Sequence, residues 1–249
     1  MYFRRVSGKA PDVDRQARFW DWHWAHESER KTRNVWKEQR HEAILSLLQS
    51  LPLAGARILD VGCGSGWYTE KLSRCGEVTG IDLSEVAVAT ATARFPHLTF
   101  QQGNFCTMDL PPEHFEVVIA QEVFDHVEDQ VAFLERVSFV LKSKGYFVLS
   151  CTNRFVMDRL GESEYVPQPP DHVANYLTAR ELRRTLRSRF DVRRITSVLP
   201  MGQRGVLRLV NSNKLNRLLH LVASPGRLEA AKERACLGYQ LIALAQKRS

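Results

Sequence analysis

The sequence contains no run of about 18 apolar residues, the length that a membrane-spanning helix needs. Its first residues, Met1-Tyr2-Phe3-Arg4-Arg5, are not followed by the apolar segment of a secretory signal. The five cysteines are odd in number and form no C-x-x-C pair, which argues against a disulfide framework and against a zinc site. No two carboxylates stand at metal-ligand spacing. We therefore expect a cytoplasmic protein with reduced thiols, no membrane span and no metal.

The composition is that of an ordinary water-soluble globule. Hydrophobic residues make up 44% and charged residues 25% of the 249 positions, and no internal repeat or low-complexity tract is visible. This length is sufficient for one sizeable α/β domain with additions.

The positive charge is concentrated at the C-terminal end. The net charge is +3 for residues 1–50, −6 for residues 51–150 and +10 for residues 151–249. One interpretation is an anionic partner: a carboxylate or phosphate substrate, an acidic carrier protein, or RNA. The other is a set of solvated arginines on helix surfaces. The run 180–194 favours the second, because its arginines are expected on several sides of a helix.

A glycine turn organises the middle of the chain. The apolar run 57–61 stops at Gly62, Gly64 and Gly66, and a helix-compatible segment, 67–74, follows at once. This order is typical of the first β-α unit of a nucleotide-binding sheet, in which glycine lets a ligand approach the backbone and the helix start faces an anionic group. The next strand ends at Asp82, where a carboxylate can accept hydrogen bonds from a ribose.

Two cofactor classes fit this turn, and a plain glycine turn is a third possibility. A dinucleotide site would read G-x-G-x-x-G, but here the third glycine comes one residue early and Asp60 precedes the first. The run 60–66, D-V-G-C-G-S-G, resembles motif I of the class I S-adenosylmethionine (AdoMet) methyltransferases. The resemblance implies that the turn faces the methionine part of AdoMet and that Asp82 faces the ribose.

A second resemblance narrows the substrate class. The segment 122–127, E-V-F-D-H-V, resembles the E-x-x-E-H-V segment of quinone-type O-methyltransferases and their small-molecule relatives, with Asp125 in place of the second glutamate. The resemblance also implies that Asn104 reads the adenine edge while Phe105 packs on the ring; a plain loop is the alternative. The implied cofactor-binding residues are Asp60, Gly62, Cys63, Gly64, Gly66, Tyr68, Asp82, Leu83, Asn104, Phe105, Gln121 and Val123.

The expected fold is α/β, a Rossmann-like, mostly parallel sheet of seven strands with helices on both faces. Strands are predicted over 57–61, 77–81, 99–101, 115–121, 146–151, 190–199 and 238–246. Helices are predicted over 36–48, 67–74, 85–94, 129–142, 179–189, 215–222 and 228–237.

Two additions flank this domain, which is expected to span residues 56–249. Residues 1–55 form a helical extension that carries four of the five tryptophans, and these aromatics either cover the ligand as a lid or pack the extension onto the domain. Residues 200–237 are far longer than an ordinary hairpin connection and are expected to form a helical cap that faces the substrate.

Two histidines are candidates for a general base. His126 follows the fourth strand, at the edge of the sheet where ligands bind, and His172 lies on the loop after a proline-rich stretch. Each could instead be structural. The sequence predicts an AdoMet-dependent methyltransferase that is a monomer or homodimer and acts on a small, possibly anionic or carrier-bound molecule, most readily at oxygen. The alternatives are an RNA- or protein-modifying methyltransferase and a non-enzymatic AdoMet-binding protein.

Overall fold

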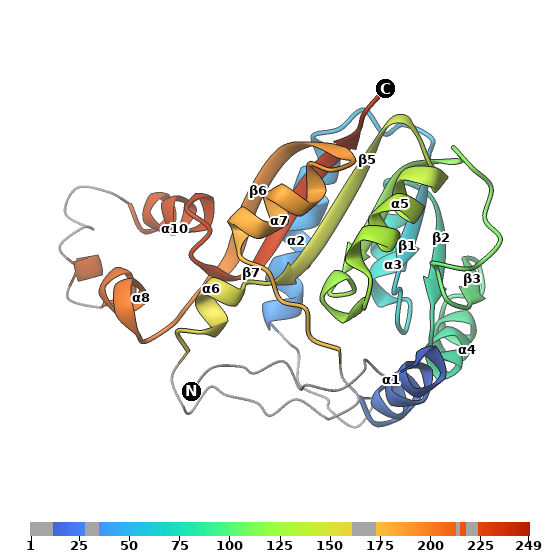
Figure 1. Ribbon diagram of the computed structural model, residues 1–249, viewed down its shortest axis with the longest axis horizontal. Coiled ribbons are helices and arrows are strands. Elements are labelled where there is room, and N and C mark those ends of the chain that lie inside the picture. The colour runs from blue at the N-terminus through green and yellow to red at the C-terminus, as the bar shows by residue number, and fades with distance from the viewer. Residues whose placement is uncertain (1–11, 28–34, 161–172, 213–214, 218–223) are drawn as a thin grey trace.

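The computed structural model describes residues 12–27, 35–160, 173–212, 215–217 and 224–249 (Figure 1). Seven strands form one sheet in the order β3-β2-β1-β4-β5-β7-β6, in which β7 runs in the direction opposite to that of the other six strands. The predicted fold class is therefore confirmed. The strands are β1 Ala56–Val61, β2 Gly76–Asp82, β3 Thr99–Gln102, β4 Phe115–Gln121, β5 Leu141–Thr152, β6 Phe190–Pro200 and β7 Gly238–Lys247.

Helices cover both faces of the sheet (Figure 1). An apolar cluster with α5 and α7 fills one face, and a second cluster with α2 and α3 fills the other. None of the helices in the described ranges is long and apolar enough to cross a membrane. The helices are α1 Val13–Glu27, α2 Val35–Gln49, α3 Trp67–Leu72, α4 Glu85–Arg94, α5 Gln130–Val140, α6 Arg154–Met157, α7 Ala179–Leu186, α8 Gly205–Val210 and α10 Pro225–Arg234, with a 3-10 turn, η1, at Phe124–His126.

Two helix starts follow from local side-chain chemistry. The hydroxyl of Ser84 accepts a hydrogen bond from the Ala87 amide and caps α4. Thr178 and Glu181 form a reciprocal capping box at the start of α7. Both caps fix how the chain leaves the carboxyl edge of the sheet, where a ligand site is expected.

Some boundaries differ from the sequence prediction. The helix predicted over 129–142 ends at Val140, because Leu141 already pairs with Phe115 and the strand begins there. Helices α6 and α8 are not among those predicted, and α10 begins at Pro225 rather than at 228. Of the helix predicted over 215–222, only residues 215–217 lie within the described ranges.

The arginines of α7 do not point in several directions, so that expectation was wrong. At about 100° per residue, the three arginines of α7 and its C-cap Arg187 share one sector of the helix, opposite the buried Leu182 and Leu186. The three are Arg180, Arg183 and Arg184. Arg180, Arg184 and Arg187 are exposed and Arg183 is half-buried, so solvated arginines on a helix surface remain one interpretation of the charge.

Candidate functional site

The glycine turn lies between the carboxyl ends of β1, β2 and β4. The amides of Gly62 and Cys63 both donate to the carbonyl of Ile81, at 2.7 and 3.0 Å, which ties the turn to β2. Gly62 has φ 72°, and a Cβ built there would lie 2.1 Å from Cγ2 of Val123. Glycine is required here by backbone conformation and by packing at once. Glycines 64 and 66 also have positive φ, at 53° and 76°.

Asp82 is held beside this turn by backbone amides. Its Oδ2 accepts from the Gly64 amide at 2.8 Å and its Oδ1 from the Ser84 amide at 2.9 Å. A carboxylate offers about four lone-pair positions, so each oxygen can accept a further bond. Burial raises the pKa of Asp82, while the amides oppose that shift. The adjacent Leu83 is half-buried.

Asp60 has a partner inside the domain. The Thr69 hydroxyl donates to its Oδ2 at 2.7 Å, which joins the end of β1 to α3. Burial raises the pKa of Asp60 to about 7, with Asp82 contributing to the rise. The observed contact of Asp60 is therefore structural: it stabilises the turn by connecting β1 to α3. Cys63 is buried, and burial raises the pKa of its thiol, so it is an apolar wall and no nucleophile.

Several buried side-chain polar atoms have no hydrogen-bond partner among the described residues. They include the Tyr68 hydroxyl, Gln121 Oε1 and Arg40 Nε, and also His41 Nδ1 and Asp125 Oδ1. Arg40, on α2, donates from Nη1 to Gln240 Oε1 at 3.0 Å and lies 3.8 Å from Glu122 Oε2. Buried groups of this kind normally carry partners, so they suit a polar ligand. Arg40 was not predicted from the sequence, because nothing marks a helix arginine as inward-facing.

His41 is a buried, neutral neighbour of this group. Its ring stacks on Tyr68 with centroids 4.3 Å apart. Burial, and then the charge of Arg40, lower the pKa of His41 to about 3. The folded state therefore binds fewer protons than the unfolded state between about pH 3 and pH 6.5. The stability that the neutral His41 ring contributes to the fold is present above pH 6.5 and is lost as the pH falls below that value.

This pKa shift leads to a testable prediction. At pH 5 the neutral His41 should destabilise the fold by about 2 kcal/mol relative to pH 7.5. A His41→Phe variant keeps the stacking and removes the titration, so its melting temperature should fall less between the two pH values. Thermal unfolding of both proteins at pH 5 and 7.5 measures the difference; equal falls would contradict the buried neutral state.

The segment after β3 fits its expected role only in part. Asn104 is half-buried, and its side chain accepts from the Cys106 amide at 3.0 Å, closing a local turn. Phe105 is 5% exposed and packs against Phe133, with ring centroids 5.2 Å apart. The structure therefore places Phe105 in the core, and its contact with an adenine ring stays a prediction.

His126 is fastened to the segment that precedes α7. Its Nδ1 lies 2.8 Å from the carbonyl oxygen of Val173, so Nδ1 carries the proton. Burial lowers the pKa of His126, which makes the neutral ring the dominant form at pH 7. Asn175 holds the same segment by donating to the Val127 carbonyl. The other candidate base, His172, lies outside the described residues.

Two carboxyl groups flank His126 at the end of β4. Glu122 has φ 54°, and its carboxylate accepts from the Ser150 hydroxyl at 2.9 Å and from Gln240 Nε2 at 2.8 Å. Asp125 is fully buried and accepts from the Thr152 amide at 2.6 Å. Burial, and then Glu122, raise the pKa of Asp125. Among the described residues, no group of three His, Cys, Asp or Glu is arranged to hold a metal.

Helix α1 lies across the glycine turn. A Cβ built on Gly64 would lie 2.3 Å from the Trp24 ring, so this indole covers the turn. Asp21 accepts from the Ser84 hydroxyl at 2.6 Å, and the Trp20 ring lies 5.1 Å from that of His126. The extension thus contacts three parts of the site. Whether it opens and closes as a lid stays a prediction.

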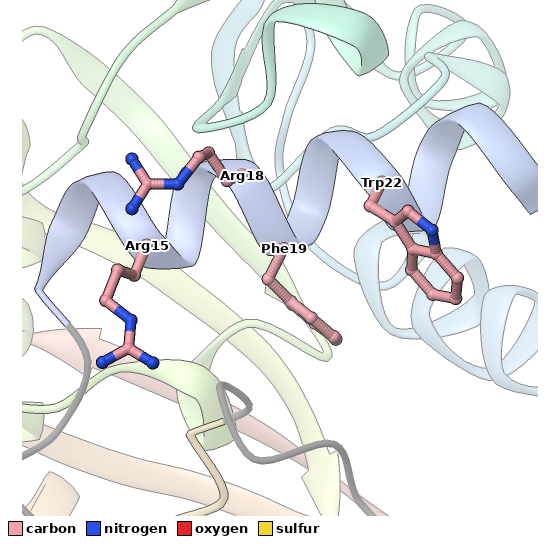
Figure 2. Close-up of a pocket in the computed structure, with 4 residues that line it drawn as sticks. All are labelled: Arg15, Arg18, Phe19 and Trp22. Atoms are coloured by element: carbon pink, nitrogen blue, oxygen red, sulfur yellow. The ribbon is translucent and has the colours of Figure 1, made fainter.

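The opposite side of α1 carries a different set of residues. A cavity of about 300 Å³ is lined there by two arginines and two aromatic side chains, all from α1 (Figure 2). Their spacing, i, i+3, i+4 and i+7, places them on one face of the helix. They are Arg15, Arg18, Phe19 and Trp22.

Comparison with known proteins agrees with this geometry. Residues 59–149 match a family described as a methyltransferase domain. The structure superposes on an S-adenosylmethionine-dependent methyltransferase from Mesorhizobium loti with TM-score 0.57, covering 81% of this chain and 96% of that chain at 22% identity. It superposes on the [4+2]-cyclase SpnF with TM-score 0.67, covering 96% of this chain and 98% of that chain. The sequence identity is 17%, so this is a likeness of fold alone. Residues 59–149, which run from β1 to β5, therefore match a methyltransferase domain, and the fold around them is one that S-adenosylmethionine-dependent methyltransferases adopt.

The curated relatives that the chain matches include ubiquinone biosynthesis O-methyltransferases. The ubiquinone biosynthesis O-methyltransferase of Bradyrhizobium diazoefficiens is 41% identical over 106 residues, which are 41% of this chain and 42% of that protein. The one from Rhodopseudomonas palustris strain TIE-1 is 35% identical over 162 residues, 60% of this chain and 62% of that protein. A probable S-adenosylmethionine-dependent methyltransferase of Mycolicibacterium smegmatis is 33% identical over 122 residues, which are 49% of this chain and 47% of that protein. The chain therefore spans about half the length of these relatives.

Proposed function

We propose that this protein transfers the methyl group of AdoMet to a small molecule, most readily to an oxygen atom of a quinone-type, natural-product or sugar acceptor. The observation that carries the proposal is the glycine turn with Asp82 beside it, together with the unpartnered polar atoms of Tyr68, Gln121 and Arg40. Tyr68, Gln121 and Arg40 suit the polar methionine end of the cofactor, and Asp82 suits its ribose. These roles fit the class, in which AdoMet is the cofactor.

Bound AdoMet supplies an activated methyl group on a sulfonium, with a neutral thioether as the leaving group. The residues of the chain must bring the acceptor into line, exclude water and take up one proton from a hydroxyl acceptor. The neutral ring of His126 is suited to receive that proton through Nε2, since Nδ1 already donates to Val173. Trp20 and Trp24 lie where they would shield the site from water.

The oxygen acceptor is supported by the relatives named for ubiquinone O-methylation and by the segment 122–127. RNA or protein is the alternative acceptor. Nucleic-acid binding by the basic C-terminal stretch would weaken steeply with salt, because neutralised phosphates release counterions. Gel-shift and methylation assays with tRNA at physiological salt distinguish the two: tight binding with methyl transfer to tRNA would refute the small-molecule proposal.

Replacing Asp82 tests the cofactor assignment. Asp82→Ala removes the acceptor of the ribose bonds and should weaken AdoMet binding by about 1.5–3 kcal/mol, the usual value for bonds to a charged group. Titration calorimetry measures the change, with Glu77→Ala on the same strand as a matched acidic control because Glu77 is exposed. Unchanged affinity in the Asp82 variant, or tighter binding of NAD than of AdoMet by the wild type, would reject the assignment.

A further inference from the structure

A cavity opens where β6 ends and α8 begins, on the far side of β5 from the glycine turn. Its volume is about 450 Å³, and its described lining is Gly202, Gln203, Arg208 and Asn211. Strand β6 runs antiparallel to β7, which runs antiparallel to β5, so the end of β6 reaches the same sheet edge as the end of β4. The cavity and the candidate methyl-transfer site therefore share one edge.

The cavity is positively charged. Arg208 makes no ion pair or side-chain hydrogen bond with any described residue, and the whole stretch 192–228 contains seven lysines and arginines but no aspartate or glutamate. Arg159, after α6, adds a second guanidinium, whose Nε would lie 3.7 Å from a Cβ built on Gly205. The Arg159 carbonyl also accepts from the Gln203 amide at 3.1 Å. An anion placed here would meet cations without any competing carboxylate from this stretch.

The supporting groups around the cavity are held in place. The Arg159 guanidinium stacks over the Phe155 ring at 4.0 Å and donates to the Phe155 carbonyl at 2.9 Å. The Asn211 amide nitrogen is 3.4 Å from the Gly202 carbonyl, which orients its amide at the cavity wall. Guanidinium and amide donors arranged in this way match the several acceptor oxygens of a phosphate.

We propose that this cavity binds a phosphate group carried by the methyl acceptor. The proposal rests on the proposed function, since it names a feature of that acceptor. Three strand spacings separate β4 from β6 in the sheet, or about 14 Å, so the phosphate and the methylated atom lie well apart on an extended molecule. The phosphate belongs either to a lipid or to a soluble ester, and Val206 and Leu209, which are 48% and 61% exposed on α8, would lie beside the chain of a lipid.

Calorimetry on the full chain, saturated with S-adenosylhomocysteine, tests the proposal. The probes are farnesyl phosphate, glucose 1-phosphate, inorganic phosphate and the neutral alcohol farnesol. We expect at least one phosphate ester to bind and farnesol to bind at least tenfold more weakly than farnesyl phosphate. Arg208→Gln should weaken the binding of the phosphate ester at least tenfold. Arg227→Gln, an equal change of charge on exposed α10, should alter it less than twofold.

Each outcome is decisive. Tighter binding of farnesyl phosphate identifies a lipid source, and equal or tighter binding of glucose 1-phosphate identifies a soluble one. Equal losses in the two arginine variants, binding of farnesol as tight as that of its phosphate, or no binding of either ester would overturn the proposal. Saturation with S-adenosylhomocysteine is measured first in every protein, so a failure of the cofactor assignment appears there and is separate from a failure at the cavity.

Discussion

Gly62→Ala should reduce AdoMet affinity and fold stability more than any other single methyl group added to the glycine turn. The new Cβ would lie 2.1 Å from Cγ2 of Val123 in a backbone with φ 72°. Left-handed backbone costs a non-glycine residue about 1–2 kcal/mol, and overpacking adds about 1–3 kcal/mol. The sum, about 2–5 kcal/mol, is a large part of the stability of a typical domain.

Two further variants separate these two causes. Gly55→Ala places the same methyl group at φ 69° with no atom within 4 Å, so it measures backbone strain alone. Gly62→Ala combined with Val123→Ala removes the clashing methyl group and should recover the packing part of the loss. Chemical denaturation and AdoMet titration of the four proteins provide the test. If Gly62→Ala loses no more stability and no more AdoMet affinity than Gly55→Ala, the contact between the turn and Val123 contributes nothing measurable to either.

The sequence predicted the parts of the fold that depend on local patterns. β4 was predicted over 115–121 and observed with the same bounds, since a continuous apolar run flanked by polar residues reads as a buried strand. α4 was predicted over 85–94 and observed with the same bounds. In both cases the information lies within about ten consecutive residues.

The contacts that complete the site could not be predicted in this way. Arg40 reaches Gln240, 200 positions away, and Asp21 reaches Ser84, 63 positions away. Such contacts depend on how α2 and α1 dock. The buried Ile44, Leu47 and Leu48 mark the inward face of α2, but their spacing does not indicate which groups Arg40 meets there. For Phe105 the family resemblance predicts a contact with adenine, whereas only the tertiary structure shows that its ring also packs in the core.

His126→Gln should lower turnover by about a hundredfold or more, the usual contribution of a positioned general base. AdoMet affinity should change little, because the glycine turn and Asp82 are untouched. Since burial lowers the pKa of His126, the acid limb of the wild-type rate profile should lie below pH 6.5 and should be absent from the variant. Activity should partly return at high pH if the acceptor is a phenol that ionises without help.

A purely structural role for His126 predicts a different pattern, and Asn175 provides the control. Asn175→Ala releases the same segment from the Val127 carbonyl without removing a group that can accept a proton. If holding the segment is the whole function of His126, the two variants should lose similar stability and similar turnover, and both should keep the acid limb. Melting curves and single-turnover kinetics on the same preparations decide. A stable His126→Gln protein with full turnover would exclude His126 as the base and leave catalysis to alignment of the acceptor.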